Sequence, residues 1–287
     1  MKLPNYLQTI TDEFPKLFIE GVEDIIDELN EKYTVAELSR RINVKDSTLR
    51  AVFDHRSRCS LEHLSKLFQA TRLDMWDRVF EKSTFLDGQN HKKHVKIPKS
   101  LTYELAYLMG AFRDGSISYP NEVSVSQKNR QWLQEIQKIF KNTFGLKTKI
   151  FGPREQDECY YIKISSVALY ALIKTLFNLE KGKWKTPKII LETTKNFQKF
   201  YIKGFWEAEG SFKSNGSPVI YQTWITPNQC PPLQDIIEML HKFNIKSNLL
   251  GPYKSKNRYS FELYIRSKYK EDFLKLMSSD FKMFTST

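Results

Sequence analysis

The stretch YIKGFWEAEG, residues 201–210, decides the fold of this chain. It is an apolar, aromatic run with helical spacing that ends in two carboxylates, Glu207 and Glu209, and then a glycine. The peptide dipoles make the C-terminal end of a helix partly negative, so an acid in the last turn costs about 0.3–1 kcal/mol. A cation bound beside this helix end would offset the cost.

A second stretch of this kind, LAYLMGAFRDGS, lies earlier in the chain, and Gly110 and Gly204 are 94 positions apart. Each stretch is followed by a segment that ends in Gly-Pro, GLKTKIFGP (145–153) and NIKSNLLGP (244–252). Each half then continues in one order: strand-like residues, an amphipathic helix, two strand-like segments around a turn, and a last helix. This order predicts an α+β unit with an antiparallel sheet, made twice.

Small residues recur on one face of both helical stretches, at Ala106 and Gly110 in the first and at Gly204 in the second. Small residues on a helix face allow two backbones to approach closely. If the two helices pack through them, the acids that follow, Asp114 and Glu209, arrive side by side. Two neighbouring carboxylates repel unless a proton or a cation lies between them, so a hard divalent cation such as Mg²⁺ is expected there.

Both stretches resemble the paired motifs of the LAGLIDADG homing endonucleases, whose single-chain members carry two repeats. The resemblance covers about residues 100–287. It implies two pseudo-symmetric repeats whose antiparallel sheets form a saddle over the major groove of DNA, with the motif helices at the interface. It also implies a site-specific double-stranded DNA endonuclease that hydrolyses phosphodiester bonds with Mg²⁺ or another divalent cation such as Mn²⁺.

The resemblance assigns metal binding to Asp114 and Glu209. In the first repeat it assigns Gln127 to a metal-bound water and Lys128 to the scissile phosphate. A metal ion lowers the pKa of bound water and stabilises the attacking and leaving oxygens. Lysines stabilise the negative charge of the transition state, and one such centre per strand would give a double-strand break.

The second repeat matches this strand less closely. Gln222 stands for the glutamine, but Thr223 replaces the lysine. Lys213, just past EGSF, is the candidate basic group on this side.

The first motif is also one residue shorter, because Gly110 lies four residues before Asp114 whereas Gly204 lies five before Glu209. One residue rotates a helix position by about 100° and shifts it by about 1.5 Å. Either the first helix packs through a shifted register, or its end is rebuilt so that Asp114 still reaches the metal. Glu207 is interpreted as a solvated or helix-capping residue.

The region before the repeats is expected to be a separate all-α domain. Residues 34–68 break into short helical pieces that resemble the helix-turn-helix of lambda-repressor-like DNA-binding domains, in which the second helix enters the major groove. A packing or protein-contact module is the alternative. By the resemblance, the residues that face DNA are Lys45, Ser47, Thr48 and Arg50, with Arg56 and Arg58 near phosphates.

The predicted boundaries are 1–90 for the helical domain, 91–99 for a linker and 100–287 for the endonuclease-like domain. Within that domain the repeats are predicted at 100–190 and 195–287. In the linker, His91 and His94 bracket two lysines and are interpreted as solvated rather than metal-bound.

Charge distribution points to a polyanionic partner. The net charge is +12, with 15 Lys/Arg and 16 Asp/Glu in residues 1–95, which leaves 30 and 17 in residues 96–287. This excess indicates nucleic acid rather than an anionic membrane surface. The chain lacks a long apolar run and a signal-like start, and its three cysteines form neither a disulfide framework nor a metal-ligand spacing. We therefore expect an intracellular, reduced protein. It is also expected to act as a monomer.

Two further hypotheses remain beside the nuclease. The helix-turn-helix and the short first motif also suit a transcription regulator whose catalytically degenerate LAGLIDADG domain only binds DNA. Some members of the resembled family act as RNA maturases, so an intron RNA is a further candidate partner.

Overall fold

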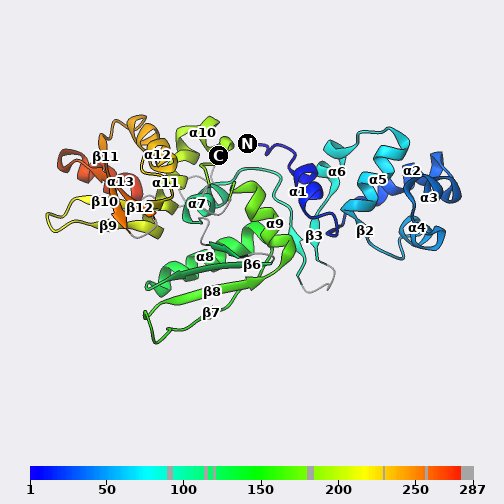
Figure 1. Ribbon diagram of the computed structural model, residues 1–287, viewed down its shortest axis with the longest axis horizontal. Helices are drawn as coiled ribbons and strands as arrows, with labels where there is room; N and C mark the ends of the chain where they lie inside the picture. Colours follow the sequence, from blue (N-terminus) through cyan, green and yellow to red (C-terminus); the bar gives the residue numbers. More distant parts are fainter. Residues whose placement is uncertain are drawn as a thin grey trace.

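The computed structural model describes residues 1–88, 93–112, 116–118, 121–179, 184–228, 230–255 and 258–278. The N-terminal region and the second repeat lie at opposite ends of the longest axis, and the first repeat and the two motif helices lie between them (Figure 1). Within the described residues, no helix combines the length and the apolar character that crossing a membrane requires.

Two α+β units follow one another along the chain, as the duplication predicts. The first consists of α7 (Tyr103–Ala111), β5 (Ile117–Ser118), β6 (Glu122–Gln127), α8 (Arg130–Phe144), β7 (Ile150–Phe151), β8 (Tyr160–Ser165) and α9 (Val167–Leu176). The second consists of α10 (Lys188–Glu192), α11 (Lys195–Glu209), β9 (Gly210–Phe212), β10 (Pro218–Trp224), α12 (Pro231–His241), β11 (Ser247–Ser255), β12 (Arg258–Ile265), a short 3-10 helix η2 (Ser267–Tyr269) and α13 (Lys270–Met277).

The two four-stranded sheets have the same topology. Their strand orders are β5-β6-β8-β7 and β9-β10-β12-β11, and neighbouring strands are antiparallel. The repeated Gly-Pro pairs occupy equivalent places, because Gly152 directly follows β7 and Gly251 lies at the irregularity in β11, with φ +99° and +112°. Because side chains rarely adopt this backbone conformation, glycine is required at both positions. The predicted antiparallel α+β fold with two equivalent repeats is therefore confirmed.

The motif helices α7 and α11 pack directly against each other in the centre of the molecule. A Cβ atom added at Gly110 would lie 1.9 Å from the carbonyl oxygen of Tyr201, and one added at Gly204 would lie 2.0 Å from that of Tyr107. Only glycine permits this backbone approach, which explains the small residue at each position. The predicted interface between the motif helices is thus present.

The N-terminal region contains the expected helices and, in addition, a small sheet. Its helices are α1 (Leu7–Glu13), α2 (Glu23–Lys32), α3 (Val35–Ile42), α4 (Asp46–Phe53), α5 (Leu61–Thr71) and α6 (Trp76–Lys82). The sheet has the order β2-β1-β3-β4, formed by β1 (Phe18–Ile19), β2 (Cys59–Ser60), β3 (Phe85–Asp87) and β4 (Val95–Lys96). The expectation of a purely helical domain missed this sheet because strands of two or three residues carry almost no alternation in sequence.

The segment expected to be a linker contributes β4 to that sheet. Val95 and Ile97 are buried on either side of exposed Lys96, and β4 pairs with β3. The N-terminal region also contacts the first repeat, since Phe14 lies edge-on to Tyr170 with 5.8 Å between ring centroids. The connection between the two regions is therefore packed rather than an extended tether.

Candidate active site

An open cleft of about 610 Å³ lies between the two sheets, at the ends of the motif helices. Ser124, Ser126 and Lys163 of the first repeat line one side. Glu209 and Thr223 of the second repeat line the other. Since both repeats supply its walls, neither repeat forms the cleft alone.

Glu209 is brought to the cleft by an unbroken helix. Helix α11 continues to Glu209 and is closed by Gly210, whose N–H donates to the carbonyl oxygen of Trp206. A Cβ atom on Gly210 would lie 2.1 Å from the Trp206 ring, so only glycine fits at this helix end. Glu209 is half-buried and lies at the negative end of the helix, where a bound cation would be stabilising.

The first motif helix ends earlier than the second. Helix α7 stops at Ala111, and Phe112 is already extended, with φ −104° and ψ 138°. Phe112 is buried between Phe140 and Phe177, with ring centroids 5.6 and 6.1 Å away. Asp114, the predicted partner of Glu209, lies outside the described residues.

The helix register itself is not shifted. Gly110 faces the backbone of Tyr201 and Phe205, and Gly204 faces the backbone of Tyr107 and Ala111. These two contacts are related by the same 94-residue offset that separates the glycines. The one-residue difference between the motifs is therefore accommodated after the helix crossing and not within it.

Strand registers show that Gln127 and Gln222 occupy equivalent positions. Ile117 of β5 pairs with Val123, and Phe212 of β9 pairs with Pro218, and each glutamine follows four residues later. Their cross-strand partners on β8 and β12 correspond as well. The sequence alignment of these two strands was therefore correct.

The two glutamines have different surroundings. Gln222 lines the cleft, and its Nε2 donates to the carbonyl oxygen of Thr223 over 3.0 Å. Its Oε1 is buried without a hydrogen-bond partner among the described residues. Gln127 does not line the cleft, and its Oε1 accepts from the backbone N–H of Lys128.

Neither predicted lysine lines the cleft. Lys128 is well exposed, with Nζ 3.6 Å from a carboxylate oxygen of Glu158. The Nζ of Lys213 lies 2.6 Å from a carboxylate oxygen of Glu262, and this hydrogen bond raises the pKa of Lys213 above its usual value.

Lys163 lines the cleft and was missed in the sequence. Its Nζ lies 2.5 Å from a carboxylate oxygen of Glu122, which also lines the cleft. Lys163 is exposed between buried Ile162 and Ile164 on β8. This alternation is the signal that could have identified it as a residue of the open sheet face.

Glu207 is not a solvated acid but the end of a hydrogen-bonded chain between the repeats. The hydroxyl of Tyr107 donates to Glu207, and the indole N–H of Trp132 donates to that hydroxyl over 2.6 Å. Burial, together with neighbouring Glu207, raises the pKa of Tyr107. Because these residues lie on α7, α8 and α11, these hydrogen bonds join the two repeats beside the cleft, which Trp132 lines.

The predicted DNA-facing residues of the N-terminal region are exposed around the start of α4. They are Lys45, Ser47, Thr48 and Arg50. Arg56 is also exposed, with one N–H 2.5 Å from Asp54. Arg58 differs, because its guanidinium lies 2.9 Å from buried Asp87 and 4.3 Å from the Phe18 ring centroid. It is therefore a packed residue of the small sheet and not an open contact for phosphate.

The second repeat matches a known family. Residues 196–278 match the family described as LAGLIDADG-like domain. The matched segment contains the second of the two motifs, residues 201–210.

Two curated proteins are similar to about half of the chain. Homing endonuclease I-ApeI from Aeropyrum pernix is 27% identical over 157 residues, which cover 50% of this chain and 68% of that protein. The glutamine–fructose-6-phosphate aminotransferase of Methanocaldococcus jannaschii is 27% identical over 146 residues. That match covers 49% of this chain and only 13% of the aminotransferase.

Solved structures are also similar to part of this chain. I-DmoI in complex with DNA and Mn is 18% identical with a TM-score of 0.46, over 62% of this chain and 98% of that chain. The N-terminal LAGLIDADG domain of DUF199/WhiA is 14% identical with a TM-score of 0.43, over 62% and 82%. Because these identities and TM-scores are low, the fold assignment depends on the strand order and the helix packing described above.

Proposed function

We propose that this protein is a site-specific double-stranded DNA endonuclease of the homing type that depends on a divalent cation. The observation that carries the proposal is Glu209 at the end of α11, in a cleft whose walls come from two equivalent antiparallel sheets. The excess of Lys/Arg over Asp/Glu in residues 96–287 suits a phosphate backbone. The similarity to a named homing endonuclease supports the same class.

Glu209 and Asp114 would hold the cation, with Gln222 beside them. Carboxylate and amide oxygens are hard donors that suit Mg²⁺ or Mn²⁺. A bound divalent cation supplies a water of lowered pKa and stabilises charge on the reacting oxygens. Gln222 has an unpaired, buried Oε1 at the cleft wall, among the residues described, and this oxygen would orient such a water once the side chain turns toward the cleft.

The lysines would stabilise the scissile phosphates from two directions. Lys128 follows β6 in the first repeat, whereas Lys213 follows β9 in the second. Like any lysine, Lys213 is cationic at neutral pH, and its hydrogen bond to Glu262 raises its pKa further. Each lysine would stabilise the charge that develops during cleavage of one strand.

The N-terminal region would add a second DNA contact through α4. Lys45, Ser47, Thr48 and Arg50 are exposed together at its start, with Arg56 nearby. We leave Arg58 out of this set because its guanidinium is engaged by Asp87. Arg50→Ala is expected to weaken duplex binding and to reduce the salt dependence of the affinity by about one phosphate contact.

A selection from randomised duplex DNA with the full chain provides the substrate for the test. The selected duplex, inserted in a plasmid, is expected to be linearised in the presence of Mg²⁺ or Mn²⁺ and to remain intact with EDTA. Glu209→Gln is expected to bind the same duplex without cleaving it. Tight binding by the unaltered protein, with no cleavage in either metal, would contradict the proposed activity.

A DNA-binding regulator without nuclease activity is the second candidate. It is favoured by the early end of α7 at Ala111, three residues before Asp114. A regulator would keep its effect on transcription when Asp114 and Glu209 are both replaced by alanine. Measuring the affinity for duplex DNA and for intron RNA at one stated salt concentration tests the maturase alternative in the same preparation.

A further inference from the structure

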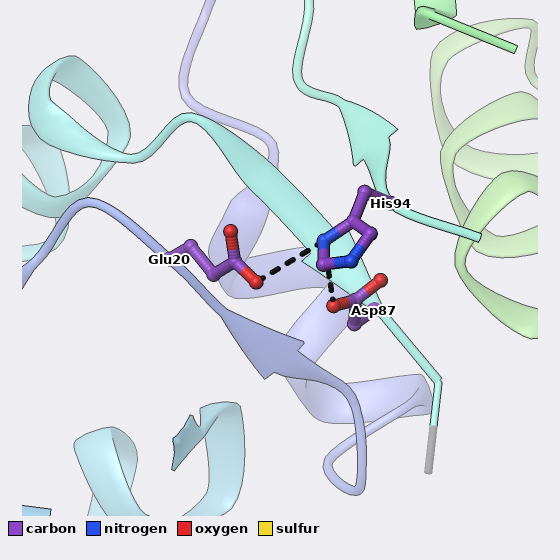
Figure 2. A group of neighbouring side chains, drawn as sticks. All are labelled: Glu20, Asp87 and His94. Carbon is purple, nitrogen blue, oxygen red and sulfur yellow. Dashed lines mark ion pairs between the residues drawn. The ribbon is translucent and has the colours of Figure 1, made fainter. Parts of the chain in front are cut away.

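A cluster of three potential metal ligands lies in the N-terminal region, outside the cleft. Glu20 follows β1, Asp87 ends β3 and His94 precedes β4, and their side chains converge (Figure 2). The Nδ1 atom of His94 lies 3.2 Å from a carboxylate oxygen of Glu20 and 3.1 Å from one of Asp87. The three ligand atoms all lie within 4.8 Å of one another.

This spacing suits a tetrahedral metal ion. Ligand atoms bound about 2.0–2.1 Å from Zn²⁺ lie about 3.3 Å apart along the edges of the tetrahedron. The two measured separations from His94 are close to that value. Small movements of the side chains would therefore suffice to bind an ion.

Asp87 provides an independent indication of a missing cation. Its side chain is fully buried, and its Oδ1 has no hydrogen-bond partner within the described part of the chain. A buried carboxylate oxygen without a partner is costly, so such atoms are normally satisfied by a donor or an ion. Oδ2 already lies beside His94 and Arg58, so a metal ion bound by both oxygens of Asp87, or by Oδ1 after rotation of the carboxylate, would supply this partner.

The local charges permit a divalent ion. Arg58 lies 2.9 Å from Oδ2 of Asp87 and neutralises one of the two carboxylates. With neutral His94, the cluster of Glu20, Asp87, His94 and Arg58 has a net charge of −1, which a divalent ion changes to +1. A proton on His94 would instead bridge the two carboxylates, so proton and metal compete for the same place.

We propose that Glu20, Asp87 and His94 bind a divalent transition-metal ion of the Zn²⁺ type. An imidazole with two carboxylates favours such an ion, whereas Mg²⁺ prefers oxygen ligands throughout. The His94 side chain is 53% exposed, which leaves an entry path and an open fourth position for water. The ion would tie β1 to both ends of the β3–β4 connection, directly before the endonuclease-like domain.

The test is a Co²⁺ titration of the full chain, followed by visible absorption, and a Zn²⁺ titration followed by calorimetry. The unaltered protein is expected to show a ligand-field band from one Co²⁺ ion per chain bound at this cluster, beside any ion held in the cleft. Glu20→Gln and His94→Gln are each expected to weaken binding by at least about tenfold. Zn²⁺ is also expected to raise the Tm of the unaltered protein, and this rise should vanish in His94→Gln.

Two control variants separate this cluster from other sites. His55→Gln removes an exposed histidine whose Nε2 lies 2.8 Å from Asp27, and it should titrate like the unaltered protein. Glu209→Gln removes the proposed metal-binding acid of the cleft and should also leave the Co²⁺ band intact. Asp87 is not substituted, because its loss would leave Arg58 without its buried partner.

The proposal is overturned by any of three results. The unaltered protein could show no saturable binding, which would indicate a protonated His94 bridging the carboxylates. Glu20→Gln and His94→Gln could titrate like the unaltered protein. The band could disappear in Glu209→Gln and persist in His94→Gln, which would place the ion in the cleft.

Discussion

The two repeats share a scaffold but differ where chemistry is expected. Their sheets have the same strand order, and Gly110 and Gly204 make reciprocal contacts across the helix pair. Yet α11 continues five residues beyond its glycine to Glu209, whereas α7 stops one residue beyond its own. Duplication therefore conserves what holds the halves together, while the helix ends follow their own local packing.

The strands beside the cleft also combine an equivalent backbone with different side chains. Gln127 and Gln222 occupy equivalent positions, but the next residue is Lys128 in the first repeat and Thr223 in the second. Lys213 is the proposed basic group of the second repeat. It follows β9, the edge strand of its sheet, and not β10, the strand that carries Gln222. Equivalent backbones thus carry the candidate lysines at different positions.

The largest effect is expected from adding a methyl group at the helix crossing. Gly110→Ala and Gly204→Ala would each place a Cβ about 2 Å from a carbonyl oxygen. Each substitution should lower the free energy of unfolding by about 3 kcal/mol or more, because backbone atoms must move apart. Urea unfolding of both variants measures the loss, and similar values would show that the crossing is symmetric.

Gly88→Ala is the matched control for the helix crossing, because a Cβ there meets nothing within 4 Å. Its unfolding midpoint should remain near that of the unaltered protein. If either helix variant were as stable as this control, the close approach of α7 and α11 would be disproved.

The second effect concerns cleavage, where the acids of the two repeats can be compared directly. Asp114→Asn and Glu209→Gln are each expected to slow cleavage of the selected duplex by about 100-fold or more, since each removes charge that holds the cation. Duplex affinity should change little. Rates are measured with saturating protein, and Glu192→Gln, which changes an exposed acid at the end of α10, is the control.

Full activity in Asp114→Asn together with loss in Glu209→Gln would break the symmetry of the site. The early end of α7 would then have removed the first acid from the reaction. Equal losses would instead show that the segment after α7 restores Asp114 to the metal.

Much of this organisation could be predicted from the sequence, because it depends on local periodicity and on repetition. The small residues of the motif helices predicted their close packing, and the repeated order of segments, with its Gly-Pro pairs, predicted two equivalent units. The hydrogen bond from Tyr107 to Glu207 could not be predicted, since it joins residues 100 positions apart on different helices.

The cluster of Glu20, Asp87 and His94 was beyond reach for the same reason. It requires strands of two or three residues, too short to show alternation, to bring distant positions together. His94 alone, in a segment rich in lysine, suggests only a solvated side chain. The long-range pairing of strands, which sequence periodicity does not encode, creates the cluster.

A third, intermediate effect is expected from the lysines. Lys128→Met and Lys213→Met should each slow cleavage of one strand, so that nicked plasmid accumulates before the linear product. In the proposed mechanism, each lysine would stabilise the phosphate of one strand. Sequencing the nicked product is expected to assign the two variants to opposite strands.

Thr223→Lys tests whether the position of the cation matters. Thr223 is exposed and lines the cleft at the position equivalent to Lys128. Adding Thr223→Lys to Lys213→Met should recover part of the lost rate on the same strand. Recovery on the opposite strand would contradict the equivalence derived from the strand registers.

The smallest effect is expected from the two glutamines and is measured as stability rather than activity. Gln222→Leu removes a buried Oε1 that lacks a hydrogen-bond partner among the described residues, and it should raise the free energy of unfolding by about 1 kcal/mol. Gln127→Leu removes a side chain that accepts from the N–H of Lys128, so it should give no gain. Urea midpoints of the two variants decide the comparison. A gain only at Gln222 would mean that the second repeat keeps a costly polar group in the cleft for function, whereas equal values would mean that both positions serve the fold alone.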